Sequence, residues 1–142
     1  MASVELISGN PIVVKGVEHA TSGSFQVGDL VKIGTNGKWR IGTAGLFYGI
    51  ARRNAATVED TVHEVELISF GNVYSVHYVG ATSVALIGDA VDFTFTAGAH
   101  TCVEGGAGAD AYVVALDTRD AVGTTGGRIL VRFYTALGDA AF

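Results

Sequence analysis

The side chains with the clearest potential for metal or nucleophilic chemistry are four histidines and one cysteine. They are His19, His63, His77, His100 and Cys102. A zinc site needs three or four converging ligands, and no pair of these residues has the spacing of a metal-binding motif. His100 and Cys102 can share one face of a strand, but two ligands do not make a site. We therefore expect no metal and no cofactor, and we expect structural roles for His63 and His77.

Acid–base or nucleophilic catalysis has no better candidates. Nothing resembles the Gly-x-Ser-x-Gly motif of an activated serine. Glu59 and Asp60 fall in an expected loop, and Glu64 and Glu66 fall on the solvent face of an expected strand. Three further aspartates lack the spacing of a calcium loop and are interpreted as solvated turn residues: Asp110, Asp117 and Asp120. The sequence therefore predicts no catalytic residues and no enzyme.

The chain that must position these residues has the pattern of a β-protein. It contains 20 glycines and one proline, spread between short apolar runs, as is typical of many short strands joined by tight turns. In residues 62–70, Glu64 and Glu66 alternate with Val65 and Leu67, which is strand periodicity. The segment with most helical character, residues 51–62, has too much Thr and Asn to form a convincing helix.

Further strands are expected from the same alternation. They cover residues 73–79, 91–95 and 128–134, with a hairpin whose strands, 31–33 and 38–41, flank an Asn-Gly turn. We predict one all-β domain over residues 1–142. Its fold is a small β-barrel or a jelly-roll-like sandwich of about 8–10 short antiparallel strands with little helix. Residues 1–14 form an extended N-terminal arm or an edge strand.

An internal repeat is suggested by two Gly-Asp-x-Val motifs. Val27-Gly-Asp-Leu-Val31 resembles Ile87-Gly-Asp-Ala-Val91, and each is followed by a small-apolar strand, residues 48–51 or 112–116. A polar loop and an alternating strand come next in both halves. The spacing from Ala51 to Val65 equals that from Ala115 to Ile129. The alternative is that Gly-Asp-x-Val is ordinary turn-then-strand sequence.

Composition excludes several functions. The net charge is −5, whereas a nucleic-acid-binding protein usually carries a basic excess, so we expect no direct contact with nucleic acid. A single cysteine cannot form an internal disulfide. The sequence lacks a signal peptide and an apolar run long enough for a membrane helix, so we expect synthesis in the cytoplasm and no membrane partner.

Three features favour contacts with other proteins. The N-terminal segment contains Val4, Leu6 and Ile7, and such a strand can pair with its own sheet or with the exposed edge of a neighbour. Trp39, the only tryptophan, can form an interface hot spot or lie in the core. Arg52-Arg53 can meet an acidic partner or remain solvated.

The order of several short motifs resembles that of the small capsid decoration, or cement, proteins of tailed bacteriophages. The motifs are Val27-Gly-Asp-Leu-Val, Tyr48-Gly-Ile-Ala, Asn54-Ala-Ala-Thr, Glu64–Phe70 with Gly71-Asn-Val-Tyr, Ile87-Gly-Asp-Ala-Val, Val113-Val-Ala-Leu and Gly127-Arg-Ile-Leu-Val-Arg-Phe. They cover about two thirds of the chain, and residues 94–108 have no clear counterpart.

The resemblance implies a structural virion protein that binds the outer surface of the expanded head. Such a protein cements neighbouring major capsid protein subunits against DNA pressure and acts as a homodimer or homotrimer. It implies no catalytic residues. The alternative is a β-sandwich ligand- or glycan-binding module of a phage fibre or spike, in which four aromatic residues offer stacking faces: Trp39, Tyr48, Tyr74 and Tyr78.

Overall fold

A computed structural model describes residues 4–18, 25–33, 37–42, 47, 49–69, 71–96, 98–106 and 109–134. These residues contain eleven strands and one 3-10 turn, η2 (Val84–Leu86). The first six strands are β1 (Val4–Ser8), β2 (Ile12–Val17), β3 (Leu30–Ile33), β4 (Trp39–Ile41), β5 (Gly49–Ala51) and β6 (Val62–Leu67). The others are β7 (Val73–His77), β8 (Ala90–Thr96), β9 (Ala99–Glu104), β10 (Ala111–Leu116) and β11 (Arg128–Phe133).

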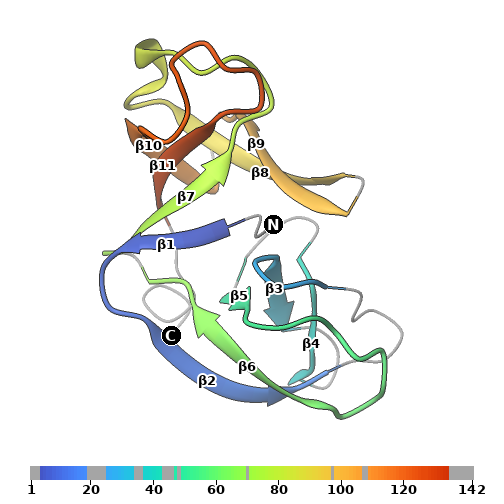
Figure 1. Ribbon diagram of the computed structural model, residues 1–142. Coiled ribbons are helices and arrows are strands. Elements are labelled where there is room, and N and C mark those ends of the chain that lie inside the picture. Colours follow the sequence, from blue (N-terminus) through green and yellow to red (C-terminus); the bar gives the residue numbers. More distant parts are fainter. Residues whose placement is uncertain are drawn as a thin grey trace.

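The strands form two antiparallel sheets that pack together as a sandwich (Figure 1). One sheet has the order β1-β7-β11-β10-β8-β9, and the other has the order β2-β6-β5-β3-β4. The all-β prediction is confirmed. Of the two predicted architectures the sandwich is observed, since the described strands form no closed barrel. Residues 34–36 of the expected Asn-Gly turn lie outside the described residues.

The two halves of the chain are copies of one five-stranded unit. The first unit is β2-β6-β5-β3-β4, and the second, β7-β11-β10-β8-β9, has the same strand order. Their registers also agree: Ile50 pairs with both Leu30 and Glu66, and Tyr112 pairs with both Ala90 and Arg132. The repeat suggested by the sequence is therefore present in the structure.

The Gly-Asp motif has the same function in each unit. Gly28 and Gly88 have φ angles of +85° and +92°, a backbone region that L side chains rarely adopt. The N–H of Gly28 donates to the Ala51 carbonyl at 2.9 Å, and the N–H of Gly88 donates to the Val113 carbonyl at 2.8 Å. The turn therefore joins the strand that follows it to the small-apolar strand of the same unit.

The structure corrects the sequence alignment of the two halves. The equivalent of Ala51 is Val113, because these residues pair with Val65 and Val131 at the same place in their sheets. The sequence comparison had matched Ala51 with Ala115. The strand β9 was not among the predicted strands. It belongs to a hairpin that is longer than its counterpart in the first unit, since β8 has 7 residues whereas β3 has 4.

Each five-stranded unit curls until its outer strands approach each other. An isolated parallel bridge joins Glu18, after β2, to Trp39 of β4, and another joins Tyr78, after β7, to Cys102 of β9. The Trp39 indole lies directly over Gly16, where a built Cβ would be 1.9 Å from its Nε1. Only a glycine permits this close approach, so Gly16 lets the first unit curl around its interior.

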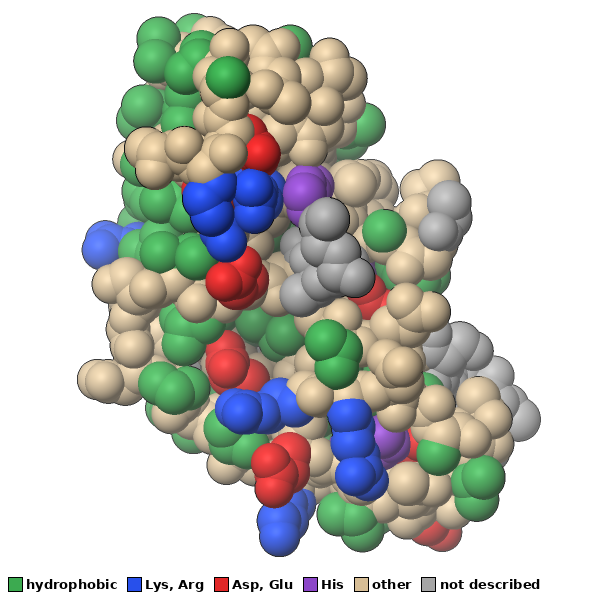
Figure 2. Space-filling model, viewed as in Figure 1, with side chains coloured by type: hydrophobic (Ala, Val, Ile, Leu, Met, Phe, Trp, Pro, Cys, Tyr) green, Lys and Arg blue, Asp and Glu red, His purple; other side chains and the backbone are tan. Residues whose placement is uncertain are grey.

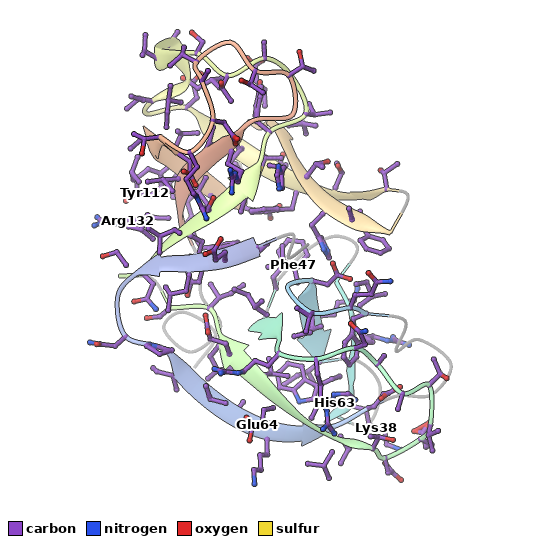
Figure 3. All side chains as sticks on the ribbon, viewed as in Figure 1. Lys38, Phe47, His63, Glu64, Tyr112 and Arg132 are labelled. Carbon is purple, nitrogen blue, oxygen red and sulfur yellow. The ribbon has the colours of Figure 1, made fainter. Side chains whose placement is uncertain are left out.

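The two interiors contain equivalent side chains. Val31, Ala51 and Val65 pack with Trp39 inside the first unit. Their equivalents in the second unit belong to a larger cluster, which continues across the junction to Leu30, Phe47 and Ile50 of the first unit. Phe47 lies between the sheets (Figure 3). The outer face of β3 and β5 in the first unit is therefore buried against the second unit.

His100 of β9 connects the two units across this junction. It is 1% exposed, its Nε2 donates to the Gly42 carbonyl at 2.5 Å, and its Nδ1 accepts from the Leu30 N–H at 3.3 Å. Its ring also contacts Phe47 edge-on, with centroids 6.1 Å apart. Both ring nitrogens are therefore held by backbone groups of the first unit, and the Asp29 carboxylate lies 3.6 Å from Nδ1.

Replacing Gly88 with alanine should destabilise the fold through backbone strain alone. A Cβ at Gly88 would meet no atom within 4 Å, but its φ of +92° is unfavourable for alanine. We expect a loss of about 1–3 kcal/mol in the free energy of unfolding, measured by urea denaturation. Gly106→Ala is the matched control, because that position is also open and has no positive φ. Equal stability of the two variants would contradict the explanation.

Candidate functional site

One hollow in the described surface lies on the first unit, over β2, β6 and the residues that follow β5. Its volume is about 410 Å³, and it is lined by Lys15 of β2, Arg52 and Arg53 after β5, and Val62 and Glu64 of β6. We call it the basic hollow, because it has three cations and one carboxylate in a chain of net charge −5. Glu64 marks its position in Figure 3.

The cations of the basic hollow are only partly engaged. Arg53 Nη2 donates to the Val62 carbonyl at 2.7 Å, which fixes one end of the guanidinium. Arg52 lies 3.8 Å from Glu66, whose pKa is raised by burial although Arg52 acts in the opposite direction. Within the described part of the chain, no carboxylate forms an ion pair with Lys15 or Arg53. The hollow can therefore accept an anionic group.

A second surface feature lies at the far end of the second unit. Two loops, residues 79–88 and 121–127, are joined by hydrogen bonds from Thr82 N–H to the Thr124 carbonyl and from Gly123 N–H to the Thr82 carbonyl. They expose four aliphatic side chains, which we call the apolar tip: Val79, Val84, Ile87 and Val122, 49–67% exposed. Neither loop contains a charged residue.

The predicted contact residues separate into two groups. Val4 is 2% exposed and Trp39 is 3% exposed, so both lie in the core, and Leu6 packs against it. The Val4 and Trp39 side chains are buried, whereas Leu6 is half-buried, and for Trp39 the core alternative is the observed one. Ile7 is 43% exposed, and Arg52 and Arg53 line the basic hollow. The contacts expected of Ile7, Arg52 and Arg53 remain predictions.

The N-terminal segment pairs with its own sheet, as an edge strand. β1 lies beside β7, with Glu5 opposite Ser75. The Val4 N–H donates to the Gly28 carbonyl at 2.9 Å, so β1 also contacts the first unit. Arg119 joins this edge to the loop after β10, since it lies 3.0 Å from Glu5 and 2.6 Å from Asp117.

The interpretation of three aspartates as solvated turn residues is wrong for Asp117, which is 5% exposed. Asp117 accepts hydrogen bonds from Arg119 and from the Ser75 hydroxyl at 2.7 Å. Hydrogen bonds from Arg119, and then that from Ser75, hold its pKa well below the usual range. Asp120 pairs with Arg128 at 2.8 Å, and this contact lowers its pKa to about 2. Asp110 accepts from the Phe93 N–H at 2.9 Å.

The interior also contains a carboxylate that no sequence pattern predicted. Glu18 is fully buried, and its carboxylate accepts hydrogen bonds from the N–H groups of Ala56 and Thr57. It lies 2.6 Å from Nε2 of His63, which shares the buried face of Val65 as expected. The pair fixes the loop that follows Arg52 and Arg53. With Glu18 at 0% and His63 at 2% exposure, no substrate reaches either group.

The other candidate ligands also have structural positions. Cys102 is buried, and burial raises the pKa of its thiol well above the usual range, so the reactive thiolate is disfavoured. His77 Nδ1 lies 3.0 Å from the Gly126 carbonyl. His19 lies outside the described residues. Across the described ranges, no three His, Cys, Asp or Glu residues are grouped to hold a metal ion.

Three of the four aromatic residues considered for glycan stacking are buried. Trp39, Tyr74 and Tyr78 are 3%, 0% and 8% exposed, and all three belong to the hydrophobic clusters. Tyr48 lies outside the described residues. The expectation that these side chains provide stacking faces is therefore wrong for three of the four. Their rings serve core packing instead.

Comparison with known proteins finds no protein-family model that matches the chain. No curated protein matches it either. In the residues that the structure describes, no helix is long and apolar enough to cross a membrane.

Asp117 should contribute to the pH dependence of stability. Its folded-state pKa is depressed, so its contribution is present above the ordinary value near 4 and is lost as the pH falls toward the folded value. Asp117→Asn should therefore lower stability at neutral pH and flatten the loss of stability between about pH 4 and pH 2. Urea denaturation across this range provides the measurement.

Arg119→Gln should flatten the same acid limb, because Arg119 is the main cause of the shift. An acid limb in Asp117→Asn that runs parallel to that of the wild type would contradict this account.

Proposed function

We propose that this chain is a capsid decoration protein that binds the outer surface of an expanded phage head and cements neighbouring major capsid protein subunits. The proposal places it on the virion after synthesis in the bacterial cytoplasm, and it acts there as a homodimer or homotrimer. The sequence resemblance and the β-sandwich support this reading. The glycan-binding alternative loses its specific support, because its described aromatic residues lie in the core.

One observation carries the proposal: two surfaces of different chemistry lie at opposite ends of one molecule. The apolar tip is at the upper end, where Figure 2 shows hydrophobic and uncharged atoms only, and the basic hollow is in the lower unit, among alternating basic and acidic side chains. A protein that joins two subunits needs two separate contact surfaces. The tip suits an apolar pocket, and the hollow suits an acidic segment.

The connection between these surfaces suits a mechanical role. The two units share a core cluster and the His100 hydrogen bonds, so the surfaces are linked through packed side chains and not through a linker. Repeated weak contacts on a lattice strengthen one another, because each bound contact raises the effective concentration of the next. Neither surface therefore needs to bind tightly by itself.

The test is to mix the purified chain with expanded heads built from the major capsid protein encoded beside it. The proposal expects saturable decoration at symmetry-related positions in electron micrographs, and heads that resist higher temperature. A chain that stays unbound at every capsid state, or a gene with no capsid protein gene near it, would overturn the proposal.

Charges placed on the apolar tip should weaken this decoration. The double variant Val84→Glu/Val122→Glu puts two carboxylates where apolar contact is expected, and we predict about tenfold weaker binding to heads by co-sedimentation. Val58→Glu is the matched control. Val58 is 60% exposed, close to the 67% of Val84 and the 63% of Val122, but it lies outside the tip. Equal loss in both variants would show that the tip is not the contact.

A further inference from the structure

The internal repeat shows that one strand edge of the first unit lacks, among the described strands, the partner that its equivalent in the second unit has. In the second unit, the outer edge of β7 is covered by β1. The equivalent strand of the first unit is β2, which ends the other sheet. Among the described strands it pairs along its length with β6, and β4 meets its outer edge at one point, the bridge between Glu18 and Trp39. Ile12 and Val13 of β2 are 52% and 40% exposed, so this edge is accessible.

The backbone of β2 presents hydrogen-bonding groups to this edge. Glu18 N–H donates to the Thr61 carbonyl on the β6 side, as Tyr78 N–H donates to the Gly127 carbonyl in the second unit. The parallel bridge between Glu18 and Trp39 of β4 covers this edge at its Val17 end. Because successive residues of a strand direct their N–H and C=O groups to opposite sides, those of Val13 and Lys15 are directed away from β6, on the part of the edge before this bridge. They are the groups that a further strand would bind.

Transferring the β1 register to β2 gives the chemistry of such a strand. Lys15 is the equivalent of Ser75, because Lys15 pairs with Glu64 and Ser75 pairs with Leu130 at the same position in each unit. Ser75 lies opposite Glu5 of β1. A strand added to β2 in this register would therefore place its Glu5-equivalent beside Lys15, next to the basic hollow.

Both strand edges have cationic side chains beside the position of the Glu5 carboxylate or its equivalent. On β7 the Glu5 carboxylate is met by Arg119 at 3.0 Å. On β2 the incoming residue would meet Lys15, with Arg52 and Arg53 lining the same hollow. Arginine side chains bind carboxylates through paired hydrogen bonds, so the hollow recognises an acidic side chain on the added strand.

We propose that the β2 edge is a strand-acceptor site for an extended acidic peptide segment of another protein, bound by main-chain pairing to Val13 and Lys15 and by carboxylate contact with the basic hollow. Exposed Lys15 disfavours uncharged or basic strands, which is how sheet edges avoid indiscriminate pairing. This inference does not depend on the proposed function, because a peptide tests it without any capsid.

The test uses a peptide of about six residues that alternates Glu and Val, a typical strand length, with a Lys-Val peptide as its counterpart. Backbone amides are followed by NMR during titration and hydrogen exchange. We expect new protection at Val13 and Lys15 with the acidic peptide only. Absence of protection at millimolar peptide, equal binding of both peptides, or protection at β7 in place of β2 would overturn the assignment.

Charge variants distinguish binding of the peptide at the basic hollow from a general electrostatic attraction to the protein. Lys15→Gln/Arg53→Gln should weaken binding of the acidic peptide about tenfold. Arg132→Gln is the matched control, since Arg132 is exposed on the second unit (Figure 3) and should leave binding unchanged. Equal weakening in both would overturn the role of the hollow.

Val13→Pro removes one edge donor without touching the bonds to β6, and it should reduce binding in a folded protein. If this variant loses its fold, the amide protection pattern of the wild type still decides the question. Pairing of two copies through β2 without peptide, detected by sedimentation, would show that the occupant is the chain itself and overturn the proposal.

Discussion

The structure depends on the packing of one repeat unit against the other around His100. The two copies of the five-stranded arrangement differ in burial. The outer face of β3 and β5 in the first unit is buried, whereas the equivalent face of β8 and β10 in the second unit is not. Leu30 and Ile50 are 0% and 6% exposed, but their equivalents Ala90 and Tyr112 are only half-buried. His100 gives this contact its direction, because it binds two backbone groups of the first unit while belonging to the second. The asymmetry makes each surface of the protein distinct, although the fold is duplicated.

The sequence predicted what local pattern controls. Alternation in residues 62–67 identified which side chains face the core, and the two Gly-Asp motifs revealed the repeat, because each requires a glycine at positive φ before a buried strand. The alignment of the two halves was wrong by two residues after Ala51. Small apolar strands look alike in sequence, and only the pairing of Val113 with Val131 identifies the equivalent position.

The sequence could not predict the polar groups of the interior, because their partners are distant in the chain. Glu18 is buried against His63, and Asp117 is bonded to Ser75 of another strand. A carboxylate in a turn is usually solvated, and nothing local distinguishes one that accepts backbone N–H groups or an arginine fork. The same applies to the basic hollow. Lys15 and Arg52 meet only because β2, β6 and β5 are neighbours in one sheet.

The duplication also explains why the edge of β2 is open while that of β7 is covered. Among the described strands β1 alone lies outside the two five-stranded units, and it completes the second unit by pairing with β7. Residues 9–11 then lead the chain to β2 at the end of the other sheet. A conventional protein would blunt such an edge with a charge, and Lys15 has that position. Arg52 and Arg53 add two more positive charges beside Lys15, although Lys15 alone is enough to prevent unselective pairing. Three cations beside an open edge therefore protect against unselective pairing and at the same time define which strand can bind there.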